Sequence, residues 1–233
     1  MGVTFSQFFS PRASLTEQNL PSQKGKVFIV TGGYSGVGYE LVTVLFQAGG
    51  KSVVHDTSSA GQLEYLPLEL DDLSPIKASA EAFKAKEPIL DVLWNNAGVS
   101  LPPLGSVSKH GHELQMFLAS ELARKVGLQG ILNVVQNPGN LKTNLLRHAP
   151  VWMRLAASPL LHNAKQGAYT ELWAGLSPKL TMDTNGGYVI PWGKVHRSPR
   201  QDLLDALMRE EEGGTGEAGK FREWCQQQTA EYV

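Results

Sequence analysis

A glycine-rich turn, Thr-Gly-Gly-Tyr-Ser-Gly-Val-Gly at residues 31–38, constrains the fold of this chain more than any other feature. It follows an apolar run at residues 26–31, which suits a short strand buried on both faces. After the turn, apolar residues recur on one helical face, and two glycines at 49–50 favour the end of that helix. The helix face consists of Val37, Leu41, Val44, Leu45 and Ala48. The pattern therefore predicts a strand that turns tightly into a helix.

Such a turn is suited to binding a phosphate group. Backbone N–H groups at a helix N-terminus point at whatever lies above the turn, and the helix dipole adds partial positive charge. Gly32 permits the tight turn, Gly36 lets the backbone approach the phosphates, and Gly38 lets the helix pack on the strand. We therefore expect the pyrophosphate of a dinucleotide here, because the motif lies between a strand and a helix.

The rest of the chain alternates between expected strands and helices, which predicts an α/β fold with a doubly wound, Rossmann-type parallel sheet. Ser74 is the expected N-cap of one helix, with Pro75 at its first position. Expected strands lie at residues 52–55, 63–70, 90–94, 131–135 and 188–190. Expected helices follow Ser74 and lie near residues 119–126, 164–176 and 203–207. Residues 1–24 are expected to form an irregular arm, residues 25–211 the dinucleotide-binding domain, and residues 212–233 a hinge and amphipathic tail.

Composition excludes several other classes of protein. The 233 residues suffice for one α/β domain, and a net charge of −1 argues against nucleic-acid binding. The single cysteine, Cys225, excludes an internal disulfide, and no apolar run is long enough to span a membrane. A cytoplasmic location is the expectation. The alternative is membrane association by N-myristoylation, because Gly2 and Ser6 satisfy that loose pattern.

The glycine turn, in the form Thr-Gly-x-x-x-Gly-x-Gly, and Asn-Asn-Ala-Gly at residues 95–98 together resemble the short-chain dehydrogenase/reductase family. The closest similarity is to fungal, retinol-dehydrogenase-like members, and it covers roughly residues 25–195. Pro-Gly-Asn-Leu-Lys-Thr at residues 138–143 also resembles a cofactor-contacting segment of that family. The resemblance implies these cofactor-binding residues: Gly32, Ser35, Gly36, Val37, Gly38, Glu69, Leu70, Asn95, Gly98, Leu141 and Thr143. No metal site is expected.

The resemblance implies a nicotinamide cofactor and a small lipophilic carbonyl or alcohol as substrate, in fungal secondary metabolism. We expect NADP in preference to NAD from the similar fungal proteins, although Asp56 near the second strand would favour NAD. Residues 151–161 resemble the substrate lid, and their apolar side chains suit a lipophilic ligand. They suit closure of the core or an oligomer interface equally well.

The catalytic centre of the family is absent from the sequence. Hydride transfer at a carbon that bears oxygen needs a proton donor, which the family supplies with Tyr-x-x-x-Lys one helical turn apart. None of the six tyrosines is followed by a lysine at that spacing, so no catalytic residue is assigned. Lys165 and Tyr169 stand in the reverse order, and Ser106, Ser108 and Lys109 lie in a loop that is not expected to transfer protons.

An internal deletion would explain this absence. Only 39 residues separate Gly98 from Pro138, and two helix halves of the family pattern meet near Met116 and Phe117. The chain would then lack one strand and parts of two to three helices. A separate, smaller loss near residues 56–61 would remove the helix between the second and third strands. Losing about 400 Å² of apolar burial would cost roughly 10 kcal/mol, so we expect a marginally stable fold or a homo-oligomer.

Three interpretations of the function remain open at this level. The chain is an NAD(P)-dependent oxidoreductase, a catalytically inactive relative that binds a dinucleotide or a partner, or the product of a mis-spliced gene model. The sequence does not choose among them.

Overall fold

The glycine turn lies at one end of a parallel sheet in the computed structural model, which describes residues 11–53, 61–70, 72–98, 119–147, 149–196 and 201–232. The strands of these residues are β1 (Val27–Val30), β2 (Lys51–Val53), β3 (Gln62–Leu63), β4 (Val92–Trp94), β5 (Val135–Gln136), β6 (Tyr188–Ile190) and β7 (Lys194–Val195). The α-helices are α2 (Gly36–Gln47), α3 (Ile76–Lys86), α4 (Ala119–Gly127), α5 (Val151–Ala157), α6 (Ala164–Leu176), α7 (Gln201–Leu207) and α8 (Glu217–Thr229).

Four parallel strands form the first sheet, in the order β3-β2-β1-β4. Phe28 of β1 pairs in register with Ser52 of β2 and with Val92 of β4. The chain fills one side of β1 first and then crosses to the other side to form β4. The order reverses between β1 and β4, and ligands of open α/β sheets bind at such a switch point. This arrangement confirms the predicted Rossmann-type class.

A second, smaller sheet has the order β5-β6-β7, in which β5 and β6 are parallel and β7 is antiparallel. A continuous doubly wound sheet would place β5 beside β4. Among the residues that the structure describes, no strand joins β4 to β5, and the two sheets remain separate. The described sheet is therefore incomplete where the sequence interval between Gly98 and Pro138 is short.

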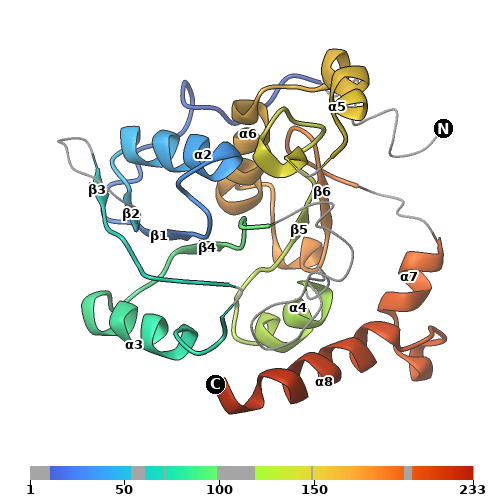
Figure 1. The fold of residues 1–233 in the computed structure, drawn as a ribbon. Coiled ribbons are helices and arrows are strands. Elements are labelled where there is room, and N and C mark those ends of the chain that lie inside the picture. Colours follow the sequence, from blue (N-terminus) through green and yellow to red (C-terminus); the bar gives the residue numbers. More distant parts are fainter. Residues whose placement is uncertain are drawn as a thin grey trace.

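Helices α2 and α6 pack side by side on one face of the first sheet, and α3 lies on the opposite face (Figure 1). Helix α6 also contacts β5 and β6, so it bridges the two sheets. The main core forms between α2, α6, β1 and β4, where the rings of Phe28 and Trp94 meet edge to face at 5.5 Å. Its buried members are Phe28, Val30, Leu41, Val42, Val44, Leu45, Trp94, Ala168 and Leu172.

Two expected strands differ most from their predicted residue ranges. The strand expected at residues 63–70 is reduced to β3, because Pro67 has no N–H for a sheet ladder and its carbonyl accepts the Ser79 hydroxyl instead. The strand expected at 131–135 is displaced to β5, because the backbone N–H of Asn133 is bound by the Asn185 side chain at 2.8 Å. The predicted N-cap, Ser74, is wrong by one residue: Pro75 is the N-cap and the helix begins at Ile76.

Candidate functional site

The glycine turn connects β1 to α2 through two residues with left-handed backbone. Gly32 has φ +67° and Gly36 has φ +58°, a region that side chains other than glycine rarely adopt. Ser35 stands at the N-cap of α2 with extended backbone, and its side chain makes no capping hydrogen bond. The first N–H groups of α2 have no intrahelical partner, so they are available to an anionic ligand.

The Asn-Asn-Ala-Gly segment is bound directly to this turn. The Asn96 side chain donates to the Thr31 carbonyl at 2.8 Å, and the Ala97 N–H donates to the Thr31 hydroxyl at 3.0 Å. The Thr31 N–H in turn donates to the Trp94 carbonyl at 3.0 Å. These bonds join the carboxyl ends of β1 and β4. The two motifs that are separate in the sequence therefore form one unit at the switch point.

Close packing within this unit explains two of the glycines. A Cβ on Gly38 would lie 2.4 Å from the Asn96 side-chain nitrogen and 2.6 Å from the Gly32 carbonyl oxygen. A Cβ on Gly32 would lie 3.1 Å from the Ala97 Cα. At Gly36 the nearest atom would be the Thr143 Cβ at 3.7 Å, an ordinary van der Waals contact, so this glycine is packed less tightly than the other two. An uncapped helix start with a less tightly packed glycine fits the pyrophosphate of a dinucleotide.

The Pro-Gly segment brings two further predicted residues to the turn. Thr143 faces Gly36, and Leu141 and Val37 both lie against Gly167 of α6. The segment is held in place by His162, whose backbone pairs with that of Leu141 and whose carbonyl accepts the Lys142 N–H at 2.8 Å. Leu141, Thr143 and Val37 are thus brought together near the start of α2.

Other predicted residues lie farther out. Asn95 and Gly98 are exposed, and Asn96 rather than Asn95 makes the side-chain bond that fixes the strand end. The sequence contained this signal, because two asparagines stand side by side, but alternation along a strand does not say which one turns inward. Glu69 and Leu70 lie exposed on the connection between β3 and α3.

Some sequence predictions fall outside the described residues. These are Gly2 and Ser6 of the myristoylation pattern, Asp56, the loop residues Ser106, Ser108 and Lys109, and the Met116–Phe117 junction. The structure places none of them.

Lys165 and Tyr169, the reversed pair on α6, bind the N-terminal arm. The Tyr169 hydroxyl donates to one carboxylate oxygen of Glu17 at 2.6 Å, and the Lys165 ammonium contacts the other oxygen at 2.6 Å. Burial, followed by the bond to Glu17, raises the pKa of Tyr169 above its ordinary value. A catalytic tyrosine of this family needs the opposite shift. The pair therefore anchors the arm to α6.

Glu171 on α6 is a buried carboxyl group near the break between the two sheets. It is 2% exposed, and its Oε2 has no hydrogen-bond partner. The Gln136 side chain of β5 hydrogen-bonds to the carboxyl group, while the Glu171 carbonyl accepts the Trp94 indole N–H of β4 at 2.8 Å. Desolvation by burial raises the pKa of Glu171 to about 8. The residue is neutral at lower pH, but the described contacts give it no role at the glycine turn.

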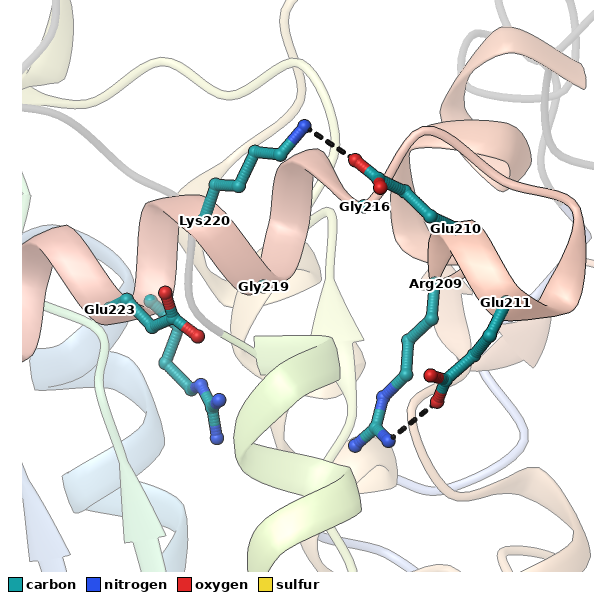
Figure 2. A pocket seen from close by; sticks show the side chains of 8 residues that line it. Arg209, Glu210, Glu211, Gly216, Gly219, Lys220 and Glu223 are labelled. Carbon is teal, nitrogen blue, oxygen red and sulfur yellow. Dashed lines mark hydrogen bonds and ion pairs between the residues drawn. The ribbon is translucent and has the colours of Figure 1, made fainter.

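A pocket beside the C-terminal helix α8 is lined mainly by charged side chains, unlike the glycine turn (Figure 2). Its lining consists of Arg209, Glu210, Glu211, Gly216, Gly219, Lys220, Arg222 and Glu223. Lys220 pairs with Glu210 at 2.8 Å, and Arg209 pairs with Glu211 at 3.3 Å. Paired charges of both signs and two glycines do not suit a lipophilic substrate. Just before the expected hinge and tail of residues 212–233, a 3-10 turn at Glu210–Glu212 carries two of these ion pairs.

Among the described residues, no group of three or more His, Cys, Asp or Glu side chains is placed to hold a metal ion. No helix in the part of the chain that the structure describes has both the length and the apolar character needed to cross a membrane.

A parallel sheet with a glycine turn at its switch point, opening an uncapped helix, defines a nucleotide-binding protein of the doubly wound α/β class. The family profile for short chain dehydrogenases matches residues 26–136. A short-chain dehydrogenase/reductase of Pestalotiopsis fici is 33% identical, with 98% of each chain covered. The chain belongs to the short-chain dehydrogenase/reductase family, as the resemblance predicted.

Further fungal relatives agree. A short-chain dehydrogenase/reductase of Phomopsis amygdali is 30% identical, covering 98% of this chain and 97% of the relative. A short-chain dehydrogenase/reductase of Emericella nidulans is also 30% identical, and the alignment covers 97% of this chain and 99% of the relative. The alignment with the Pestalotiopsis fici protein extends over 325 positions, whereas this chain has 233 residues. At least 92 aligned positions, the difference between these lengths, therefore have no residue in this chain.

Solved structures share the fold. A 3-oxoacyl-[acyl-carrier protein] reductase from Brucella melitensis gives a TM-score of 0.57 at 13% identity, covering 77% of this chain and 95% of that one. A blue fluorescent protein from a metagenomic library, solved in complex with NADPH, gives a TM-score of 0.56 at 19% identity. The match covers 74% of this chain and 98% of that one. A Brucella melitensis reductase with bound NAD gives a TM-score of 0.55 at 14% identity, and the match covers 78% of this chain and 95% of that one. At these identities the likeness concerns the fold alone.

Proposed function

We propose that this chain binds a nicotinamide dinucleotide at the glycine turn, with NADP preferred over NAD. The observation that carries the proposal is the unit formed by Thr31, Asn96 and Ala97, which holds the open, uncapped start of α2 at the switch point of the sheet. The pyrophosphate would lie over residues 35–37. The nicotinamide end would lie beside Leu141 and Thr143. The preference for NADP follows the similar fungal proteins.

The reaction proposed for the family site is reduction of a lipophilic carbonyl, or oxidation of the alcohol, in fungal secondary metabolism. The bound cofactor would supply the hydride, and a protein side chain must supply the proton. This chain has no Tyr-x-x-x-Lys, and the raised pKa of Tyr169 argues against that residue as a substitute. We therefore propose that the 233-residue form binds the cofactor without turning over a substrate.

The length difference supports the proposed internal deletion. The fungal relatives cover nearly all of both chains, so the additional positions fall largely within the matched span. We propose that the missing segment belongs between Met116 and Phe117 and carries the catalytic strand and tyrosine. The genomic DNA between these two codons tests this point. An open frame that encodes Tyr-x-x-x-Lys would support it, and a directly continuous coding sequence would make the short form the natural one.

A pair of substitutions at Gly36 tests cofactor binding. Asparagine and aspartate are the side chains that most often adopt left-handed backbone, and a Cβ at Gly36 would make only ordinary van der Waals contact with Thr143. Gly36→Asp adds a negative charge where the phosphates would lie, so NADPH affinity should fall at least about tenfold. Gly36→Asn is the matched neutral comparison: its side chain has the same size and also obstructs the phosphates, so it should bind NADPH more weakly than the unmodified chain but more tightly than Gly36→Asp. Isothermal titration calorimetry with NADPH and NADH measures both effects. Equal affinities for the two variants would contradict the proposed site.

A further inference from the structure

An exposed apolar surface, which we call the α5 patch, projects beside the candidate cofactor site. It consists of Leu145, Val151, Trp152, Leu155 and Leu160. Val151 and Trp152 are each 68% exposed and Leu155 is 70% exposed, and their spacing places them on one side of α5. Figure 1 shows α5 at the periphery of the molecule, away from the sheets. Proteins rarely leave such a group of large apolar side chains in water without a binding function.

The segment that leads into α5 carries positive charge. From residue 141 to residue 150 the sequence has two cations, Lys142 and Arg147, and no Asp or Glu. Lys142 and Arg147 are exposed just before α5. Within the described part of the chain, neither of these two cations has an acidic side chain within ion-pair distance. The apolar side chains of α5 are therefore preceded in the chain by a short, exposed basic segment.

We propose that the α5 patch docks on the surface of an anionic lipid bilayer. A short amphipathic segment binds there by placing its apolar side chains at the boundary of headgroups and acyl chains. Tryptophan is favoured at that depth, and lysine and arginine beside it are attracted by anionic headgroups.

The position of the patch gives docking a functional consequence. Thr143 faces Gly36 at the glycine turn, and α5 begins eight residues later at Val151. A bilayer that contacts α5 would therefore lie near the nicotinamide end of the proposed cofactor site. A lipophilic ligand could then pass from the membrane to the site without crossing water. Docking itself is independent of the proposed cofactor binding and can be tested without any cofactor.

Vesicle flotation tests the proposal with purified, unacylated protein, so that Gly2 cannot contribute. Vesicles of phosphatidylcholine with phosphatidylserine should carry the protein, and vesicles of phosphatidylcholine alone should carry much less. The double variant Trp152→Ser with Leu155→Ser should bind at least about tenfold more weakly. The double variant Lys142→Gln with Arg147→Gln should lose the dependence on phosphatidylserine. Leu128→Ser is the matched control, because Leu128 is 96% exposed but lies between α4 and β5.

Tryptophan emission gives a second measurement that does not depend on the serine variants folding. Trp152→Phe should still float with anionic vesicles but lose most of the blue shift in emission that the unmodified protein shows with them. Circular dichroism confirms that each variant is folded. Flotation that is equal for the unmodified protein and Trp152→Ser with Leu155→Ser would overturn the proposal. So would an absence of flotation together with a dimer that this variant dissociates, because the patch would then bind a second copy.

Discussion

At the scale of single residues, Glu171 carries a defined pH dependence. Its pKa is raised from 4.5 to about 8 by burial, so the neutral carboxyl group is the form that the folded protein favours. The stability from this residue is fully present below about pH 4.5 and is lost as the pH rises through about 8. Because each pKa unit corresponds to about 1.4 kcal/mol, the loss is at most about 5 kcal/mol.

Glu171→Gln should remove this loss, since glutamine stays neutral at every pH and keeps an amide beside Gln136. Urea unfolding near about pH 5 and about pH 9 measures it: the unmodified chain should lose stability at the higher pH, and the variant should lose much less. Glu81→Gln, on the exposed side of α3, serves as the control and should behave like the unmodified chain. A variant whose loss matched that of the unmodified chain would contradict the assignment.

The individual site residues were predictable to different degrees. Gly32, Gly36 and Gly38 follow from the sequence, because a turn between a strand and a helix dictates where glycine is needed. The inward role of Asn96 did not follow, because it depends on how β4 meets the turn after β1. Glu69 and Leu70 were predicted through the family alone, and they remain predictions.

At the scale of elements, the contact between α6 and β4 depends on a glycine. A Cβ on Gly175 would lie 2.2 Å from the Trp94 ring, which is itself held by the edge contact with Phe28 and the bond to Glu171. Gly175→Ala should therefore destabilise the fold by about 1–3 kcal/mol through overpacking. Thermal or urea unfolding measures the change.

Gly219 of α8 provides the matched helical control, because its Cβ would meet nothing within 4 Å. Gly219→Ala should stabilise the chain by about 0.5–1 kcal/mol, since alanine is the better helix former. Opposite signs for the two substitutions are the expected result. A Gly175→Ala variant as stable as Gly219→Ala would show that α6 does not pack on Trp94 as described.

Elements with strong local signals were predicted best. Helix α6 has the predicted bounds of Ala164–Leu176, and β6 the predicted bounds of Tyr188–Ile190. The strand expected at residues 131–135 was misplaced, because the Asn185 side chain, far along the chain, binds its backbone. The antiparallel strand β7 was not predicted, since a two-residue strand has too short a pattern to detect.

At the scale of the whole molecule, the separation of β4 from β5 is the main departure from a continuous doubly wound sheet. The sequence indicated it through the short interval before Pro138, and the longer fungal relatives are consistent with it. The cofactor half of the fold is supported by the core between β1, α2 and β4, and α6 joins this core to the second sheet across the break. Binding can therefore persist where the proton-transfer machinery is absent.

The most direct test of this account is a titration of the purified 233-residue chain with NADPH, followed by fluorescence, with a lipophilic ketone added at saturation. We expect enhanced NADPH emission that saturates below about 1 mM, and no ketone-dependent loss of NADPH absorbance. No enhancement at millimolar NADPH would contradict cofactor binding at the glycine turn. Ketone-dependent oxidation of NADPH would contradict the inference that this chain cannot transfer the proton.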